Sequence, residues 1–291
     1  MINEFCPLCG SSDNKLLYDV SNPVVHAERG LPGMVKKCNN CNLQFKTFKQ
    51  SPVHVYNEEY AVAFKELKEY SGSHTVDFFK QILLKVTPEI KSKNEKPTLL
   101  DIGSGIGIML ETAASAGFEP VGVELSDSLA EVARSKGFNV INTDISEATI
   151  NQQFDVVSMM DIIEHLENPK KILQSIKYLI KDEGELIVYT PNHDSMIVKI
   201  AHVLYKLGIK APIENIFACS HTCFFTTHTL QTILTASGYK ITEVSNFKYN
   251  TSRPGQKISV FVKAALNIFE GIGNLIGLKG FRVVIYAQPI K

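Results

Sequence analysis

Residues 99–107, LLDIGSGIG, join an apolar segment to three alternate glycines. The segment 98–102 is apolar and rich in strand-favouring residues, as expected of a strand that is buried on both faces of a parallel sheet. The segment 108–116 has apolar residues at helical spacing. The glycines therefore form a strand-to-helix turn, because residues without a Cβ allow positive φ angles and close approach of a ligand. The following helix would offer its amino end to polar groups of that ligand.

The glycine spacing separates two classes of nucleotide site. A dinucleotide fingerprint G-x-G-x-x-G that began at Gly103 would need glycine at position 108, where this chain has Ile108. The pattern D-x-G-x-G-x-G, which starts at Asp101, resembles instead motif I of the class I S-adenosylmethionine-dependent methyltransferases. The resemblance implies that Asp101 faces the ammonium group of the cofactor, and that Gly103, Gly105 and Gly107 form the turn beneath it.

Two more acids follow in the order that this family has. A second apolar strand ends in Glu124, about 20 residues after the glycines, where a carboxylate can accept hydrogen bonds from both ribose hydroxyls. A third strand at 140–145 carries Asp144 and Ile145. By resemblance, Asp144 accepts a hydrogen bond from the adenine amino group and Ile145 packs on the adenine ring. For each acid taken alone, the alternative role is a helix cap or a solvated strand end.

The segment FDVVSMMDIIEHLENP at residues 154–169 resembles the corresponding stretch of the ubiquinone-biosynthesis O-methyltransferases. The segment begins with the fourth predicted strand of the chain, which ends at Met160, and we assign Met160 to the cofactor site. Residues 217–239 resemble an H-x-x-x-F-T block that is common to the wider group. The resemblance covers about residues 98–247 and implies an α/β fold: a Rossmann-like, doubly wound sheet of seven strands, the last two antiparallel.

Four residues are candidates for the chemistry. His221 is a plausible base for removing a proton from the methyl acceptor, with local hydrogen bonding as the alternative. Asp161, Glu164 and His165 stand at i, i+3 and i+4, so they would share a face if their segment is helical. Some relatives with E-x-x-E-H at this place hold a divalent metal, and magnesium is the ion we considered. The alternative is that these residues only orient the cofactor loop.

The first four cysteines predict a zinc site. Cys6 and Cys9 form one C-x2-C pair, and Cys38 and Cys41 form a second. Four thiolates close the coordination of zinc and leave no open position, so the site would be structural. The alternative is two reduced, metal-free turns. A zinc ribbon is not part of the ubiquinone enzymes, and it resembles the ribbon of several bacterial methyltransferases, among them sugar C-methyltransferases.

Composition shifts divide the chain into three parts and two insertions. Two tyrosines, Tyr56 and Tyr60, precede the core. They resemble tyrosines that some relatives fold over the cofactor, and we assign Tyr60 to the cofactor site. The alternative for both is aromatic packing between the ribbon and the core. The predicted parts are a zinc ribbon at 1–55, a helical connector at 56–97 and the core at 98–291, with apolar insertions at 191–226 and 248–280. We expect the second insertion to pack as a lid or on the core, with a dimer face or a membrane-surface contact as the alternatives.

Composition bounds the function. With 30 basic and 30 acidic residues and no basic stripe, the chain is not expected to bind nucleic acid. No basic region followed by an apolar run opens the sequence and no apolar run is a convincing membrane span, so we expect a cytoplasmic protein, with peripheral membrane contact left open. The predicted function is methyl transfer to oxygen, less readily to carbon, of a small or lipid-linked metabolite. The alternatives are a nicotinamide-dependent oxidoreductase and a non-catalytic zinc-ribbon binding module; the oligomeric state is not indicated.

Overall fold

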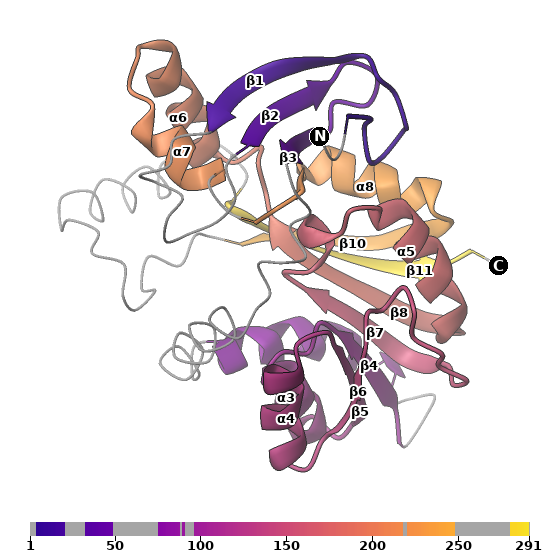
Figure 1. Cartoon of the computed structure of the whole chain (residues 1–291). Helices are drawn as coiled ribbons and strands as arrows, with labels where there is room; N and C mark the ends of the chain where they lie inside the picture. Colours follow the sequence, from indigo (N-terminus) through magenta and orange to yellow (C-terminus); the bar gives the residue numbers. More distant parts are fainter. Residues whose placement is uncertain are drawn as a thin grey trace.

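The structure is a computed structural model of the chain, and it describes residues 4–20, 33–48, 75–87, 89–90, 96–217, 220–247 and 280–290. Two sheets organise these residues: one of seven strands and one of four (Figure 1). Three sequence predictions fall outside the described residues, namely the role of Tyr60, the role of Tyr56 and a lid over 248–279.

The seven-stranded sheet has the order β10-β11-β8-β7-β4-β5-β6. Strands β4 to β8 pair in parallel, and β11 runs antiparallel to both β8 and β10. This arrangement confirms the predicted doubly wound fold and its antiparallel last pair. The strands are β4 (Thr98–Ile102), β5 (Glu119–Glu124), β6 (Asn139–Asn142), β7 (Phe154–Met160), β8 (Ile180–Pro191), β10 (Tyr239–Phe247) and β11 (Arg282–Pro289).

The chain runs outward from β4 to β5 and β6, then returns to β7 on the other side of β4. Such a reversal leaves a crevice at the carboxyl ends of the two central strands, where open α/β sheets bind ligands. The glycine turn lies at this point because it directly follows β4. The topology therefore places the predicted nucleotide turn at the position that the fold reserves for a ligand.

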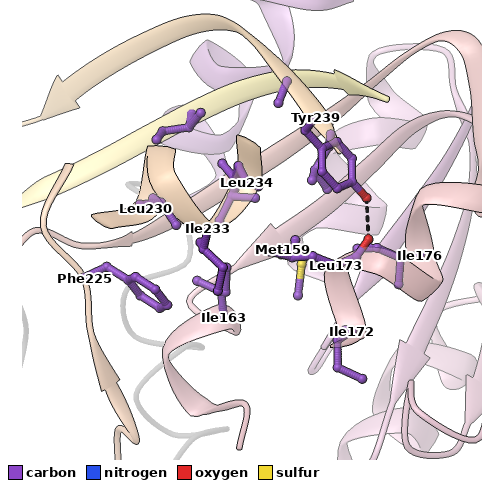
Figure 2. Packing of buried hydrophobic residues seen from close by; sticks show 14 of the residues in the cluster. Met159, Ile163, Ile172, Leu173, Ile176, Phe225, Leu230, Ile233, Leu234 and Tyr239 are labelled. Carbon is purple, nitrogen blue, oxygen red and sulfur yellow. Dashed lines mark hydrogen bonds between the residues drawn. The ribbon is translucent and has the colours of Figure 1, made fainter. Parts of the chain in front are cut away.

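Helices cover both faces of the sheet. One face carries α5 and α8, and Figure 2 shows their side chains packed together, with the Tyr239 hydroxyl donating to the Leu173 carbonyl at 2.8 Å. The other face carries α3 and a helix over 75–87, whose Phe79, Ile82 and Leu83 are buried. The helices are α3 (Ile108–Ser115), α4 (Asp127–Ser135), α5 (Pro169–Ile176), α6 (Met196–Lys206), α7 (Ala211–Phe217) and α8 (Thr227–Ala236), with short 3-10 turns η2 (Ile163–His165) and η3 (Lys177–Leu179).

The four-stranded sheet has the order β1-β2-β3-β9 and is antiparallel throughout. Its strands are β1 (Asn14–Val20), β2 (Gly33–Cys38), β3 (Gln44–Phe48) and β9 (Cys223–Phe224). The first three belong to the cysteine-bearing segment, which we call the ribbon, whereas β9 comes from the insertion after β8. Figure 1 shows the ribbon beside α6 and α7, and the Tyr18 hydroxyl lies 2.7 Å from Nδ1 of His202 on α6.

The apolar run of the first insertion forms α6, which packs on the ribbon rather than standing alone. Among the helices that the structure describes, none combines the length and apolar character needed to cross a bilayer.

Candidate functional site

The turn after β4 requires glycine. Gly103, Gly105 and Gly107 have φ angles of +73°, +53° and +85°, a region that side chains with a Cβ disfavour. A Cβ on Gly103 would overlap Cδ1 of Ile162 and lie 2.6 Å from its Cγ1. Gly107 also starts α3, so its neighbours present the amino end of that helix. The three glycines thus allow a turn that has no side chains of its own at these positions and that packs closely on the loop after β7.

Two buried acids flank this turn. Asp101 is 2% exposed and its Oδ1 accepts a hydrogen bond from the Ser158 hydroxyl at 2.7 Å, because the two residues are in register on adjacent strands. Glu124 accepts from the backbone N–H of Gly105 on Oε2 and from that of Ser126 on Oε1, both at 2.8 Å. Burial raises the pKa of Glu124. Each Glu124 oxygen keeps a lone pair, so both can still accept from a ligand's hydroxyls.

The remaining predicted cofactor residues lie at the same edge of the sheet. Asp144 and Ile145 follow β6, where the Asp144 Oδ1 accepts from the Ser146 N–H at 2.7 Å and closes a local turn. Met160 ends β7 and is half-buried. Since the carboxyl ends of parallel strands share one edge, the structure brings these residues to the crevice that holds the glycine turn. Their contacts with a cofactor stay predictions.

A second group lies beyond β7 and consists of Glu164, His165 and His221. One potential ligand atom from each lies within 4.8 Å of the others, and the two imidazole rings are 4.6 Å apart and nearly perpendicular. Glu164 is 1% exposed; its Oε2 accepts from the Thr190 hydroxyl at 2.9 Å, while its Oε1 has no hydrogen-bond partner in the part of the chain that is described. Nδ1 of His221 is also buried without one.

Asp161 does not join this group. The segment after β7 forms only the three-residue turn η2, so the shared helical face that the spacing would allow does not form. Asp161 has a φ of +58°, and its Oδ1 forms an ion pair with the guanidinium of Arg282 at the start of β11. Of the four residues predicted for the chemistry, the structure therefore gathers three and ties the fourth to Arg282.

The electrostatics of the group favour uncharged imidazoles. Burial raises the pKa of Glu164 to about 8, and the negative charge of Asp161 adds to the shift. Burial lowers the pKa of His165 to about 4 and holds that of His221 well below its usual value, with a further contribution from His165. At neutral pH the group thus offers neutral imidazole nitrogens beside a carboxyl that is largely protonated. Such groups can hold or move a proton, or bind a cation.

The donor set of this group is one carboxylate and two imidazoles. Magnesium prefers oxygen ligands in octahedral geometry, whereas two imidazoles with one carboxylate suit first-row transition metals. These donor atoms do not favour the magnesium ion that the resemblance implies.

The four predicted zinc ligands do come together. Sγ of Cys6 lies 3.4 Å from Sγ of Cys41, Sγ of Cys9 lies 3.5 Å from Sγ of Cys38, and all four lie within 4.8 Å of one another. Tetrahedral zinc with bonds of about 2.3 Å would place its sulfurs about 3.8 Å apart. The hydrogen bond between the Cys6 and Cys41 thiols lowers the pKa of Cys6 to about 5 and raises the pKa of Cys41, so Cys6 is the first of the two to become a thiolate. The four sulfurs fit a closed zinc site.

Both cysteine pairs sit in the same kind of turn. The N–H of Gly10 donates to the Cys6 carbonyl at 2.8 Å, and that of Asn42 to the Cys38 carbonyl at 3.1 Å. Gly10 and Asn42 both have positive φ angles, and glycine and asparagine are the residues that adopt them most readily. The residue after each C-x2-C pair thus carried a local signal for the turn.

Sequence reasoning missed several residues of the site. Ser158 could have been found, because the register of two central strands places it opposite Asp101. Thr190 and Arg282 could not, because their partners, Glu164 in η2 and Asp161 in the loop after β7, lie outside the strands and have no register to predict the contact. His193 was also missed; it is 5% exposed, its Nδ1 has no partner among the described residues, and burial lowers its pKa to about 3.

A protein-family model described as "Methyltransferase domain" matches residues 74–244, which is more than half of the chain. The chain belongs to the methyltransferase-domain family. The match spans the glycine turn, both buried acids and the group around Glu164, so the motifs that carried the resemblance lie inside the matched region.

Curated relatives of this methyltransferase domain include ubiquinone biosynthesis O-methyltransferases from several bacteria. That of Actinobacillus pleuropneumoniae serotype 5b is 34% identical over 106 residues, which is 32% of this chain and 45% of the relative. That of Hydrogenovibrio crunogenus is 24% identical over 152 residues, or 50% of this chain and 61% of the relative. The chain thus spans about half the length of the curated relatives that it matches.

Solved structures support the fold. A SAM-dependent methyltransferase from Archaeoglobus fulgidus superposes with a TM-score of 0.53 and 21% identity, covering 78% of this chain and 99% of that one. The plantazolicin methyltransferase BpumL, solved in complex with SAH, superposes with a TM-score of 0.55 and 15% identity, covering 83% of this chain and 95% of that one. Both superpositions support the fold of the chain and nothing finer.

Proposed function

We propose that the protein is an S-adenosylmethionine-dependent methyltransferase that acts on oxygen, less readily on carbon, of a small or lipid-linked acceptor. The observation that carries the proposal is the pair of buried acids, Asp101 and Glu124, on either side of a positive-φ glycine turn at the switch point of the sheet. A buried carboxylate suits an ammonium group, and the lone pairs that Glu124 keeps suit a ribose diol.

Each residue of the crevice then has a binding role. Asp101, oriented by Ser158, would bind the ammonium group of the cofactor. Glu124 would accept from the ribose hydroxyls while the Gly105 and Ser126 amides hold it in place. Asp144 and Ile145 would hold the adenine, by resemblance to the family.

Methyl transfer requires that the acceptor be aligned with the methyl group and that one proton be removed from the acceptor. The cofactor supplies a methyl group on a sulfonium, which is already activated for displacement. A protein accelerates such a step by fixing the approach of the acceptor and by accepting its proton. His221 is the proposed base because its neutral ring lies beside Glu164 and its Nδ1 has no hydrogen-bond partner among the described residues. Glu164 would hold a proton or orient the ring.

A transition metal held by Glu164, His165 and His221 is the alternative occupant of the same group, because their ligand atoms converge. It would acidify an acceptor hydroxyl directly. Activity that survives dialysis against a chelator of divalent cations, with the cysteine site still loaded, would exclude this alternative. Loss of activity that manganese, iron or cobalt restores would favour it.

We further propose that the ribbon holds a structural zinc ion and that the protein works in the cytoplasm. Four free thiols at one site are stable under reducing conditions. The likeness to ubiquinone biosynthesis O-methyltransferases supports a small-molecule acceptor.

The proposed activity is tested by incubating purified protein with methyl-labelled S-adenosylmethionine and fractionated cell extract, followed by mass spectrometry of labelled products. A labelled metabolite should form with the wild-type protein and not with Glu124→Gln. Glu119→Gln, which changes an exposed residue on the same strand β5, is the matched control and should leave the label unchanged. Absence of label from every fraction, with S-adenosylmethionine bound, would contradict the proposal.

A further inference from the structure

The strand β9 joins the ribbon to the group around Glu164. Phe45 of the ribbon is in register with Cys223, and the N–H of Lys46 donates to the Thr222 carbonyl at 2.9 Å. His221, the proposed base, directly precedes Thr222. The ribbon sheet therefore ends on the segment that carries this histidine.

Thr222 also hydrogen-bonds to η2, through its N–H and its hydroxyl. It is fully buried, its N–H donates to the Glu164 carbonyl at 2.8 Å, and its hydroxyl lies 2.9 Å from the Glu164 carbonyl and 2.8 Å from that of Leu166. One hydroxyl proton is shared between two carbonyl oxygens, so the side chain spans the end of the turn. A single residue thus hydrogen-bonds to the ribbon on one side and to η2 on the other.

These bonds orient the carboxyl of Glu164. Thr222 holds the backbone of Glu164, and Thr190 holds one oxygen of its side chain at 2.9 Å. The second oxygen, Oε1, is left without a partner within the described part of the chain, next to the imidazoles of His165 and His221. The direction of Oε1 depends on Thr222, because Thr222 fixes the backbone of Glu164. If that backbone shifted, the buried carboxyl could not keep its hydrogen bond from Thr190.

The ribbon in turn depends on its cysteines. Cys38 ends β2, and its N–H donates to the Leu43 carbonyl at 2.9 Å in the turn that leads into β3. Leu43 and Phe45 are buried in the same apolar cluster as Cys6, Cys38 and Ile163 of η2. A sheet this small gains much of its stability from its metal.

We propose that Thr222 is a positioning residue of the methyl-transfer site, and that the four-cysteine ribbon, acting through β9, sets the placement of His221 and Glu164. Metal binding at the four cysteines thereby controls the positions of His221 and Glu164, which face the methyl acceptor, and leaves the glycine turn of the cofactor site unaffected. The link to methyl transfer rests on the proposed function; the mechanical link between ribbon and η2 does not.

Hydrogen exchange of the full chain, measured by mass spectrometry, tests the link without an acceptor. Thr222→Val keeps the side-chain shape and removes the hydroxyl, and Thr222→Ser restores it. In Thr222→Val, exchange in peptides covering 161–166 and 220–226 should become about tenfold faster. Peptides covering 98–124 should be unchanged and Thr222→Ser should resemble the wild type. Thr47→Val is the matched control, because the buried Thr47 hydroxyl donates within the ribbon, to the Met34 carbonyl at 3.3 Å, and not to η2.

Cys38→Ser supplies the second arm, compared with wild-type protein whose zinc content has been measured. The inference predicts faster exchange in 161–166 and 220–226 on loss of the metal, with binding of S-adenosylhomocysteine retained. If Cys38→Ser does not fold, stepwise removal of zinc from the wild type by chelation, followed by the same measurement, takes its place.

Unchanged protection of 161–166 in Thr222→Val and after zinc loss would overturn the inference, and so would faster exchange that extends equally to 98–124. With an acceptor in hand, Thr222→Val should lower kcat and leave the affinity for S-adenosylmethionine unchanged. Coupled exchange without any methyl transfer would refute the proposed function and leave the mechanical link standing.

Discussion

Replacement of Gly103 by alanine tests the packing of the cofactor turn against the loop after β7. Its φ of +73° makes alanine unfavourable, at a cost of about 1–2 kcal/mol. The new methyl group would also overlap the side chain of Ile162, 2.6 Å from its Cγ1. Moving that side chain should cost about 1–3 kcal/mol more. The expected loss of unfolding free energy is the sum, about 2–5 kcal/mol.

Two further variants separate the contributions. Gly137 has a φ of +90°, and a Cβ there meets nothing within 4 Å, so Gly137→Ala reports the backbone cost alone. The double variant Gly103→Ala/Ile162→Ala removes the overlap, and its loss should fall short of the sum of the single losses by about 1–3 kcal/mol.

Urea denaturation followed by circular dichroism measures five proteins at one pH: the wild type, Gly103→Ala, Gly137→Ala, Ile162→Ala and the double variant. Equal stability of Gly103→Ala and Gly137→Ala, or strict additivity in the double variant, would refute the close packing of Gly103 on Ile162. Binding of S-adenosylhomocysteine should weaken in Gly103→Ala and not in Gly137→Ala.

Three other predictions follow from the same structure. Burial raises the pKa of Glu164 to about 8, so between about pH 5 and 7 the folded protein keeps a proton that the unfolded protein loses. The stability of the wild type should therefore fall relative to that of Glu164→Gln by about 1.4 kcal/mol per pH unit over this range. Equal pH dependence of the two proteins in urea denaturation would contradict the raised pKa. Metal analysis of protein purified under reducing conditions should find about one zinc ion per chain, and its removal should lower the melting temperature; metal-free protein with an unchanged melting temperature would refute the structural zinc. Asp161→Asn leaves the buried Arg282 guanidinium without its ion pair and should cost about 3 kcal/mol of stability, measured by chemical denaturation; a loss below about 0.5 kcal/mol, as for an exposed pair, would show that the pair contributes little.

The sequence predicted the central sheet because its strands carry local signals. The apolar runs that end at Ile102 and Met160 are buried along almost their whole length, and the run that ends at Glu124 is buried over its last three residues. Glycine at 103, 105 and 107 marks the turn by its own conformational freedom. The order of strands and the antiparallel pairing of β11 came with the family resemblance. The cysteine spacing predicted the four-sulfur cluster for a similar reason, since each pair closes within one short turn.

Long-range pairings were beyond the sequence. Nothing in the local pattern of Cys223 and Phe224 indicates that they extend the ribbon sheet, because two residues are too few for a strand signal. The ion pair of Arg282 with Asp161 depends on how β11 docks beside β8. The helical spacing at 161–165 was compatible with a shared face, yet the positive φ of Asp161 and the 3-10 turn that follows decide otherwise.

We claim that the glycine turn and its two acids bind S-adenosylmethionine, and isothermal titration calorimetry with S-adenosylhomocysteine and with NAD measures this binding. Wild-type protein should bind S-adenosylhomocysteine at one site and give no heat of binding with NAD, and Glu124→Gln should bind S-adenosylhomocysteine at least about tenfold more weakly. Binding of NAD in place of S-adenosylhomocysteine, or equal affinity in Glu124→Gln, would contradict the claim.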